Sequence, residues 1–311
     1  MGKQVGADTA SAVGVRPGRI RGVTMFEVYR GQRLARGGPI PAALRPFEDS
    51  MLEIDFAELS DVGRVRVENE DSLGHVAPDT PEQARSHGWL FAVADGVGGH
   101  EKGEVASRTA IETLVEGFRE ASRGEPLSGL LEKLVRRANT RVLDAGMNSG
   151  MATTLVACAL RYDRAVIAHV GDSRCYLVRR KAATLLTRDH TIANEHARLG
   201  LLTSEEVAEA ETRHILSRSL GSELSVSAEV SERQVLPGDV LLLCSDGLHG
   251  ALSTEDIASV VSETADVELA TRRLVGLANE KDGSDNVTAQ VVRVQNVERV
   301  GMYRGRPYKL R

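Results

Sequence analysis

The chain has 311 residues, of which 41% are hydrophobic, 27% are charged and only 4% are aromatic. This length suits one large domain or two small ones, with a core built mainly from aliphatic side chains. No apolar run approaches the roughly twenty residues of a membrane-spanning helix, and the N-terminal region lacks the apolar segment of a secretory signal.

The net charge of −5 is unevenly distributed along the chain. Residues 1–50 carry +4, residues 297–311 carry +4, and residues 51–296 carry −13. The first segment is rich in glycine, arginine and proline, which predicts a flexible N-terminal extension. The last segment is expected to be a basic C-terminal tail. Neither end resembles a nucleic-acid-binding module, so we expect solvated ends around one domain at 51–296.

The first regular elements begin after residue 88. Trp89–Ala94 is a short apolar run that ends in Asp-Gly, which predicts a buried strand followed by a turn. Apolar residues spaced three or four apart predict helices over 103–120 and 126–146. Three strands are then expected, over 153–160, 165–170 and 175–178.

Residues 190–215 interrupt this pattern. They contain two short helical stretches around Gly200, and they could form either a flap beside a cleft or a simple surface excursion. Strands are expected at 226–235, 240–244 and 287–294, with helices over 254–262 and 267–280. Helices that come in pairs between runs of consecutive strands favour an α+β fold with antiparallel sheets.

Acidic motifs recur at the edges of the apolar runs. They are Glu70-Asp71, Asp95-Gly96, Gly171-Asp172, Ser245-Asp246-Gly247 and Asp285-Asn286. Carboxylates gathered without matching histidine or cysteine ligands are typical of a site for hard divalent cations, which favours metal-assisted hydrolysis. Each motif alone could instead be an ordinary turn or a solvated acidic pair, and Asp172 could brace Arg174.

Together and in this order, the motifs resemble those of the metal-dependent serine/threonine protein phosphatases of type 2C, the PPM family. The segments concerned are Arg66-x-x-Asn-Glu-Asp71, Asp95-Gly-Val-Gly-Gly-His100, Gly171-Asp-Ser-Arg174, Ser245-Asp-Gly247 and Asp285-Asn286. The resemblance covers roughly residues 60–294, and Val97 makes it similar to the bacterial members. It implies a four-layer α-β-β-α sandwich, with two packed antiparallel sheets flanked by helices.

The resemblance also implies a cofactor and site residues. The cofactor is Mn2+ or Mg2+, with two ions and a third, looser one. Asp71 and Asp95 contribute to the binuclear centre, with Asp95 bridging the metals and the water nucleophile. Gly96 lends its backbone carbonyl, Glu70 acts through metal-bound water, and Asp246 and Asp285 hold the second ion. Asp172 resembles the ligand of the third ion.

Two further residues are given roles by the same resemblance. Arg66 binds the phosphate with its planar, permanently charged fork, and Asn286 orients the neighbouring carboxylate. His100 could assist proton transfer, or it could be an ordinary loop histidine.

Cysteine chemistry is a competing explanation for a phosphatase. The segment Cys158–Arg164 has the C-x5-R spacing of cysteine-dependent enzymes, but its intervening residues contain no glycine to form a phosphate-binding loop. We therefore interpret Cys158 as a buried, inert thiol. All three cysteines (Cys158, Cys175 and Cys244) lie in apolar runs, which fits a reducing compartment and a cytoplasmic location.

The predicted function is hydrolysis of phosphoserine and phosphothreonine in proteins, in opposition to serine/threonine kinases. The expected partners are phosphorylated proteins, including such a kinase, with no nucleic acid and no membrane, and we expect a monomer. Two alternatives remain open at this point. One is a catalytically silent phosphoprotein-binding regulator of the same fold, and the other is a phosphatase of a sigma-factor pathway.

Overall fold

The computed structural model describes residues 51–97, 102–146, 150–303 and 306–309, all within a compact unit that spans Ala35–Arg311. Residues 1–50, predicted as a flexible extension, lie outside the described part, as does His100. No described helix is both long enough and apolar enough to cross a membrane.

Two five-stranded antiparallel sheets form the centre of the unit. The first has the order β1-β10-β9-β6-β7, with β1 Glu53–Asp61, β6 Arg174–Arg179, β7 Ala182–Leu185, β9 Val240–Cys244 and β10 Val287–Asn296. The second has the order β2-β3-β4-β5-β8, with β2 Asp71–Val76, β3 Trp89–Asp95, β4 Leu155–Arg161, β5 Arg164–Val170 and β8 Glu229–Gln234.

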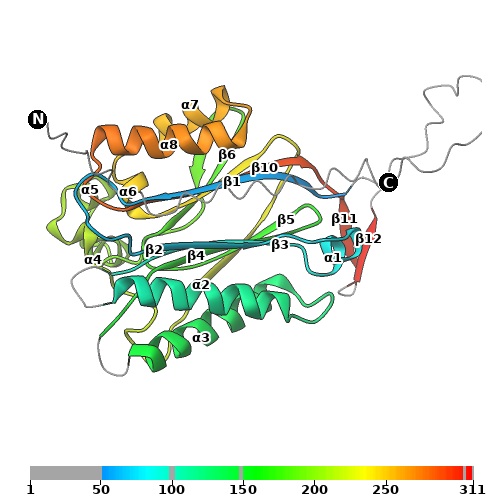
Figure 1. The fold of residues 1–311 in the computed structure, drawn as a ribbon, viewed down its shortest axis with the longest axis horizontal. Coiled ribbons are helices and arrows are strands. Elements are labelled where there is room, and N and C mark those ends of the chain that lie inside the picture. The colour runs from blue at the N-terminus through cyan, green and yellow to red at the C-terminus, as the bar shows by residue number, and fades with distance from the viewer. Residues whose placement is uncertain (1–50, 98–101, 147–149, 304–305, 310–311) are drawn as a thin grey trace, which may run out of the picture. The chain divides into compact units, whose positions relative to one another are not determined.

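Helices cover the outer face of each sheet (Figure 1). α2 Gly103–Arg119 and α3 Leu127–Gly146 pack on the second sheet, and α7 Thr254–Glu263 and α8 Val267–Lys281 pack on the first. The shorter helices are α1 Pro81–Ser86, α4 Ile192–Arg198, α5 Ser204–Glu209 and α6 Asp246–His249, with a 3-10 turn at Glu211–His214.

Strand alternation explains why four layers form. On β3, Leu90, Ala92 and Ala94 pack against α2 and α3, whereas Phe91 and Val93 point into the core between the two sheets. β9 behaves likewise, since Leu241 and Leu243 face the other sheet while Leu242 faces α7 and α8. Because successive side chains in a strand point to opposite faces, an all-apolar strand buries both of its faces. Three apolar cores result, and the predicted α-β-β-α sandwich is confirmed.

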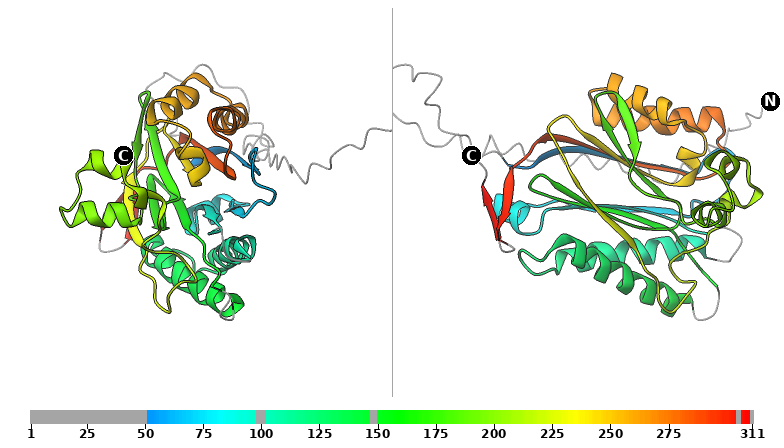
Figure 2. Two further views of the ribbon diagram at one scale, coloured as in Figure 1. Left: turned by 90° about the vertical axis from the view of Figure 1, so that its left-hand side faces the viewer. Right: turned by 180° about the vertical axis from the view of Figure 1, so that it is seen from behind.

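The region at 190–217 projects from one end of the sandwich, beside α6 (Figures 1 and 2). It contains α4, α5 and the 3-10 turn, and the N-cap residue that precedes each of them is polar or small. Thr203 and Glu206 form a reciprocal capping box at the start of α5. At the other end of the chain, the predicted basic tail contains a hairpin of β11 Val300–Tyr303 and β12 Arg306–Lys309.

Candidate metal centre

Two of the acidic residues come from adjacent strands of the second sheet. Asp71 is the first residue of β2 and Asp95 is the last residue of β3, and the register pairs them directly opposite each other. Like charges in this arrangement repel each other and destabilise the sheet. The backbone nevertheless holds the pair in place, because Asp95 exchanges hydrogen bonds with Thr154 on the other side of β3.

Two more acidic residues come from the first sheet. Asp246 begins α6 two residues after the end of β9, and Asp285 lies two residues before β10. Ser245 joins the two sheets at this point, since its hydroxyl donates to Asp71 Oδ2 over 2.7 Å and accepts from the Thr288 backbone N–H over 3.0 Å. Ser245 lies in the Ser245-Asp246-Gly247 motif, but the sequence alone did not predict its hydrogen bond to Asp71, which is 174 positions away.

The carboxylates perturb one another strongly. Burial, followed by the charges of Asp246 and Asp285, raises the pKa of Asp71 to about 7, against hydrogen bonds that lower it. Burial also raises the pKa of Asp95 well above its ordinary range, and Asp246 is the largest contributing charge. The pKa of Asp246 is raised by burial and by Asp285. Clustered, desolvated carboxylates of this kind favour protonation unless a cation neutralises them.

Asp71 offers a direct test of whether a cation fits. Its Oδ1 atom is buried and has no hydrogen-bond partner among the described residues. A buried carboxylate oxygen ordinarily has such a partner, because leaving it unpaired is unfavourable. An all-oxygen donor set with an unpaired oxygen suits a hard divalent cation such as Mn2+ or Mg2+.

Asp172 belongs to the same acidic cluster. It lies in the turn between β5 and β6, where the chain passes from the second sheet to the first. Burial and the charge of Asp246 raise its pKa to about 7. The neighbouring Arg174 pairs with Asp189, so Asp172 does not serve as the brace for Arg174 that its sequence context allowed.

His249 was not singled out from the sequence, yet it contacts this turn. Its Nε2 atom lies 3.0 Å from the backbone carbonyl oxygen of Asp172, and because that oxygen can only accept, Nε2 donates. Burial lowers the pKa of His249 to about 3, which keeps the ring neutral near pH 7. The histidine thus supports the turn.

Arg66 lies at the exposed edge of the cluster. Its Nη2 atom is 2.9 Å from Asp285 Oδ2, and its Nη1 atom is 4.0 Å from Glu70 Oε2. Its side chain remains 42% exposed, which leaves guanidinium N–H groups accessible to an anion. A planar guanidinium at this position can donate two parallel hydrogen bonds to a phosphoryl group.

The loop that carries Arg66 is fixed by Asn286. The Asn286 amide donates to the carbonyls of Val62 and Glu68, each over 3.0 Å, and accepts from the Glu70 N–H over 2.8 Å. The predicted role, orienting a carboxylate, belongs instead to the backbone N–H of Asn286, which donates to Asp285 Oδ1. The side chain positions a loop.

Gly96 lies where there is no room for a larger residue. Its N–H donates to the Glu70 carbonyl over 3.1 Å, and an added Cβ would collide with the backbone of Gly103. Ser107, one turn into α2, donates to the same Glu70 carbonyl over 2.6 Å. Together these contacts bring Glu70, Asp71, Asp95 and Gly96 to one corner of the sandwich.

The cysteines take no part in this cluster. Cys158, Cys175 and Cys244 are free thiols and are fully buried in the sheets. Burial raises the pKa of Cys158 to about 12. A thiol of that pKa is protonated at neutral pH and is a poor nucleophile, so the C-x5-R spacing carries no cysteine chemistry here.

Comparison with known proteins identifies the family of this chain. The sequence model of the family "Protein phosphatase 2C" matches residues 69–281. The chain is 34% identical over 260 residues to the serine/threonine phosphatase stp of Listeria innocua, covering 79% of this chain and 96% of that one. It is 32% identical over 241 residues to a putative protein phosphatase 2C-type of Streptococcus pyogenes, covering 75% and 94%. The chain belongs to the protein phosphatase 2C family.

Solved structures of bacterial serine/threonine phosphatases have the same fold. The Mycobacterium tuberculosis serine/threonine phosphatase PstP/Ppp matches with a TM-score of 0.69 and 34% identity, over 79% of this chain and 100% of that one. The Streptococcus agalactiae serine/threonine phosphatase matches with a TM-score of 0.72 and 31% identity, over 78% and 100%. A structure of the PstP catalytic domain in complex with two manganese ions matches with a TM-score of 0.67 and 34% identity, over 79% and 100%. The predicted family and its bacterial character are confirmed.

Proposed function

We propose that this protein hydrolyses phosphoserine and phosphothreonine in proteins and uses two Mn2+ or Mg2+ ions to do so. One observation carries the proposal. Acidic residues from both sheets converge on a buried corner beside the exposed guanidinium of Arg66. Family membership supports the same activity, and the related PstP catalytic domain binds two manganese ions.

The ions would be held by the carboxylate cluster. Asp95 lies at its centre, since it interacts with Asp71, Asp172 and Asp246, and it is our candidate for the bridging ligand. The remaining proposed ligands are Asp71, Asp246, Asp285, the carbonyl of Gly96 and, through water, Glu70. Asp172, which neighbours Asp246, would hold a third, looser ion. Bound divalent ions lower the pKa of water and neutralise phosphoryl oxygens.

The protein's own residues provide recognition and orientation. Arg66 binds the phosphate, and Asn286 keeps the Arg66 loop in register with the carboxylates. Ser245 fixes Asp71 by its hydrogen bond to Oδ2, while the buried Oδ1 has no hydrogen-bond partner among the described residues and is left available to a cation. This preorganisation reduces the rearrangement needed when substrate binds.

The proposed partners are phosphorylated proteins, among them a serine/threonine kinase whose action the enzyme reverses. We further propose a monomer in the cytoplasm that binds neither nucleic acid nor membrane. The free, buried thiols support a reducing compartment. A catalytically silent regulator would be expected to lack ligand residues, whereas every main acidic position is filled here, so that alternative is not favoured.

The activity can be tested on a phosphothreonine peptide. Chelation with EDTA should abolish hydrolysis and added Mn2+ should restore it, whereas thiol alkylation should leave it largely intact. Asp246→Asn should lower kcat by about a hundredfold or more, since it removes a carboxylate from the centre. Asp144→Asn, on the exposed face of α3, is the matched control.

The folded state of both variants is checked by circular dichroism. An Asp246→Asn variant with unchanged kinetics, or an enzyme that alkylation silences and chelation spares, would refute the proposal.

A further inference from the structure

Two consecutive residues, Asp189 and His190, hold the two ends of the turn that carries Asp172. At its end, Arg174 donates hydrogen bonds of 2.9 and 2.7 Å to the two carboxylate oxygens of Asp189. At its start, the Gly171 N–H donates to His190 Nδ1 over 3.2 Å, and the Gly171 carbonyl accepts from the His190 N–H over 2.9 Å. The position of Asp172 is therefore determined by residues far from it in sequence.

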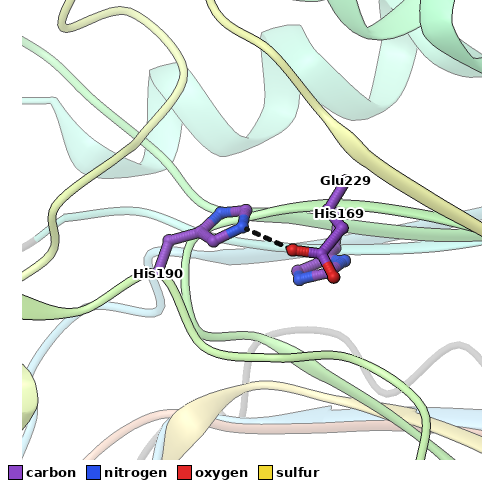
Figure 3. Close-up of side chains that lie close together, drawn as sticks. All are labelled: His169, His190 and Glu229. Atoms are coloured by element: carbon purple, nitrogen blue, oxygen red, sulfur yellow. Dashed lines mark ion pairs between the residues drawn. The ribbon is translucent and has the colours of Figure 1, made fainter. Parts of the chain in front are cut away.

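The His190 ring is enclosed rather than solvated. Its side chain is 1% exposed, and it stacks on the His169 ring with centroids 4.7 Å apart and an interplanar angle of 15°. Figure 3 shows His190 and His169 beside the carboxylate of Glu229. The Nε2 atom of His190 lies 3.6 Å from Glu229 Oε2, too far for a direct hydrogen bond, and has no other partner among the described residues. Among the residues that the structure describes, Gly171 is the one hydrogen-bond partner of the ring.

The partner of Nδ1 fixes the protonation state of the ring. A backbone N–H can only donate, so Nδ1 must accept and cannot carry a proton. Burial, followed by the charges of His169 and Arg218, lowers the pKa of His190 to about 4. The ring is accordingly neutral near pH 7, with its single proton on Nε2.

His169, His190 and Glu229 together have the composition of a transition-metal site, and their potential ligand atoms lie within 4.8 Å of one another. Two observations argue against that role. A metal on His190 Nε2 would displace its proton, and the neutral ring could then keep that proton only on Nδ1, where the Gly171 N–H points. Moreover, lone pairs lie in the ring plane, so two stacked imidazoles do not aim theirs at a common point.

His190 is also the first residue of the insertion beside the cluster. Its carbonyl accepts from the Ser217 N–H over 2.8 Å, and the Ile192 N–H donates to the Ile215 carbonyl over 2.8 Å. Thr191 and Leu216 form the bridge between these two bonds. The insertion thus leaves and rejoins the body of the domain at His190.

We propose that His190 is a positioning residue, which fixes the Gly171–Asp172 turn through its Nδ1 acceptor and ties the base of the 190–217 insertion to that turn. This inference rests on the proposed phosphatase function and deepens it. A loosened turn would place Asp172 imprecisely, which would weaken the binding of the loosest cation and lower kcat. The Arg66 loop makes no contact with His190 in the hydrogen bonds of the described residues, so KM should change little.

Two substitutions of His190 separate the effect of the Nδ1 acceptor from that of the rest of the ring. In His190→Asn the amide oxygen can occupy the place of Nδ1, whereas in His190→Gln the amide lies one carbon further out, near the place of Nε2. Both variants lose the stacking on His169. Val261→Ala, in the core under α7, is the control for general destabilisation.

Three measurements are made on the full chain: kcat and KM for a phosphothreonine peptide with Mn2+, Mn2+ binding by calorimetry, and amide hydrogen exchange at Gly171 by NMR with diamagnetic Mg2+ in place of Mn2+ and without peptide. His190→Gln should lower kcat by about tenfold, as for lost supports of metal ligands, with KM unchanged within about twofold. It should also weaken the weakest Mn2+ site and accelerate exchange at Gly171. His190→Asn should preserve kcat within about threefold and keep Gly171 protected.

Equal losses in the two histidine variants would overturn the proposal, because the acceptor would then be irrelevant. A Gly171 amide that remains protected in His190→Gln would overturn it as well, as would a comparable fall in kcat in Val261→Ala. The exchange measurement does not depend on catalysis. Failure of this inference is therefore distinguishable from failure of the proposed function, which the Asp246→Asn variant reports.

Discussion

Burial of Asp172 in the acidic cluster should destabilise the metal-free protein when this carboxyl group is ionised. Asp172 is 7% exposed and lies near Asp246, and burial with this neighbour raises its pKa from 3.8 to about 7. Between these two pH values the folded protein holds a proton that the unfolded chain has released. Metal-free protein should therefore lose the contribution of Asp172 to stability as pH rises through this range.

Asp172→Asn tests this directly in EDTA. At pH 8 the variant should be more stable than the parent by at most about 4 kcal/mol, since ionising a carboxyl group of raised pKa penalises the folded state. Well below pH 3.8 the carboxyl group is protonated in both the folded and the unfolded state, and the difference should vanish. Urea unfolding of parent and variant at each pH provides the measurement.

Taking the difference between the two proteins removes the titrations that the substitution leaves unchanged, such as those of buried histidines outside the acidic cluster. The lowered pKa values of His190 and His249 give the opposite slope between about pH 4 and 6.5 in both proteins. An Asp172→Asn variant that gains no stability at pH 8 would show that this carboxylate is not desolvated.

At the scale of elements, the side-chain amide of Asn286 makes several of the hydrogen bonds that hold the loop from Val62 to Asp71. Three backbone groups of the loop bond to Asn286, which is itself 4% exposed at the start of β10. Gly63 assists at a positive φ of 82°, because a Cβ there would strike the backbone of Asp285. The loop therefore holds Arg66 in place although its outer residues are exposed.

Asn286→Asp preserves shape but replaces the donor group with an acceptor facing two carbonyl oxygens. We expect the free energy of unfolding to fall by about 1–3 kcal/mol. We also expect KM for a phosphopeptide to rise about tenfold as Arg66 loses its position, a change of about 1.4 kcal/mol in binding. Steady-state kinetics and urea unfolding test both.

Asn296→Asp, at the opposite end of β10, is the control, because the oxygen that accepts from Val297 is retained. A KM that stays constant in Asn286→Asp despite the lost stability would mean that the loop does not position Arg66.

For the whole molecule, the acidic centre spans the two sheets. Asp71 and Asp95 belong to one sheet, while Asp246 and Asp285 adjoin strands of the other. Bound cations would consequently link the two halves of the sandwich. Mn2+ at a hundred times its dissociation constant should stabilise the fold by about 2.7 kcal/mol.

Thermal unfolding with Mn2+ and with EDTA measures this link. The parent protein should melt at least about 4 °C higher with Mn2+, and Asp246→Asn should lose most of that difference. Equal shifts in the two proteins would place the binding ions elsewhere.

Periodicity in the sequence located most of the buried elements. The four long helices and the strands β3 to β6 and β8 to β10 fall within a few residues of their predicted ranges. In the two large sheets, the strands β1, β2 and β7 were missed, and all three lie at sheet edges. These three strands are half exposed and carry mixed side chains, so they lack the apolar signal of a central strand. The strands β11 and β12 were missed as well, because their segment was predicted only as a basic tail.

The acidic centre was likewise only partly predictable from the sequence. Short motifs predicted its acidic residues and Arg66, because turns after strands carry recognisable residue types. The supports at Ser245, Asn286 and His190 depend on hydrogen bonds between distant segments. A sequence pattern contains no information on such partners, so these roles became visible only in three dimensions.

The buried thiols have a consequence for the conditions under which the enzyme can work. Peroxide attacks exposed thiolates, and it silences enzymes that depend on them. All three sulfurs here are shielded in the sheets, and Cys158 stays protonated. Exposure to peroxide should therefore leave the phosphatase activity intact, whereas depletion of manganese and magnesium should abolish it. Metal supply, rather than thiol oxidation, should therefore limit the activity of this protein.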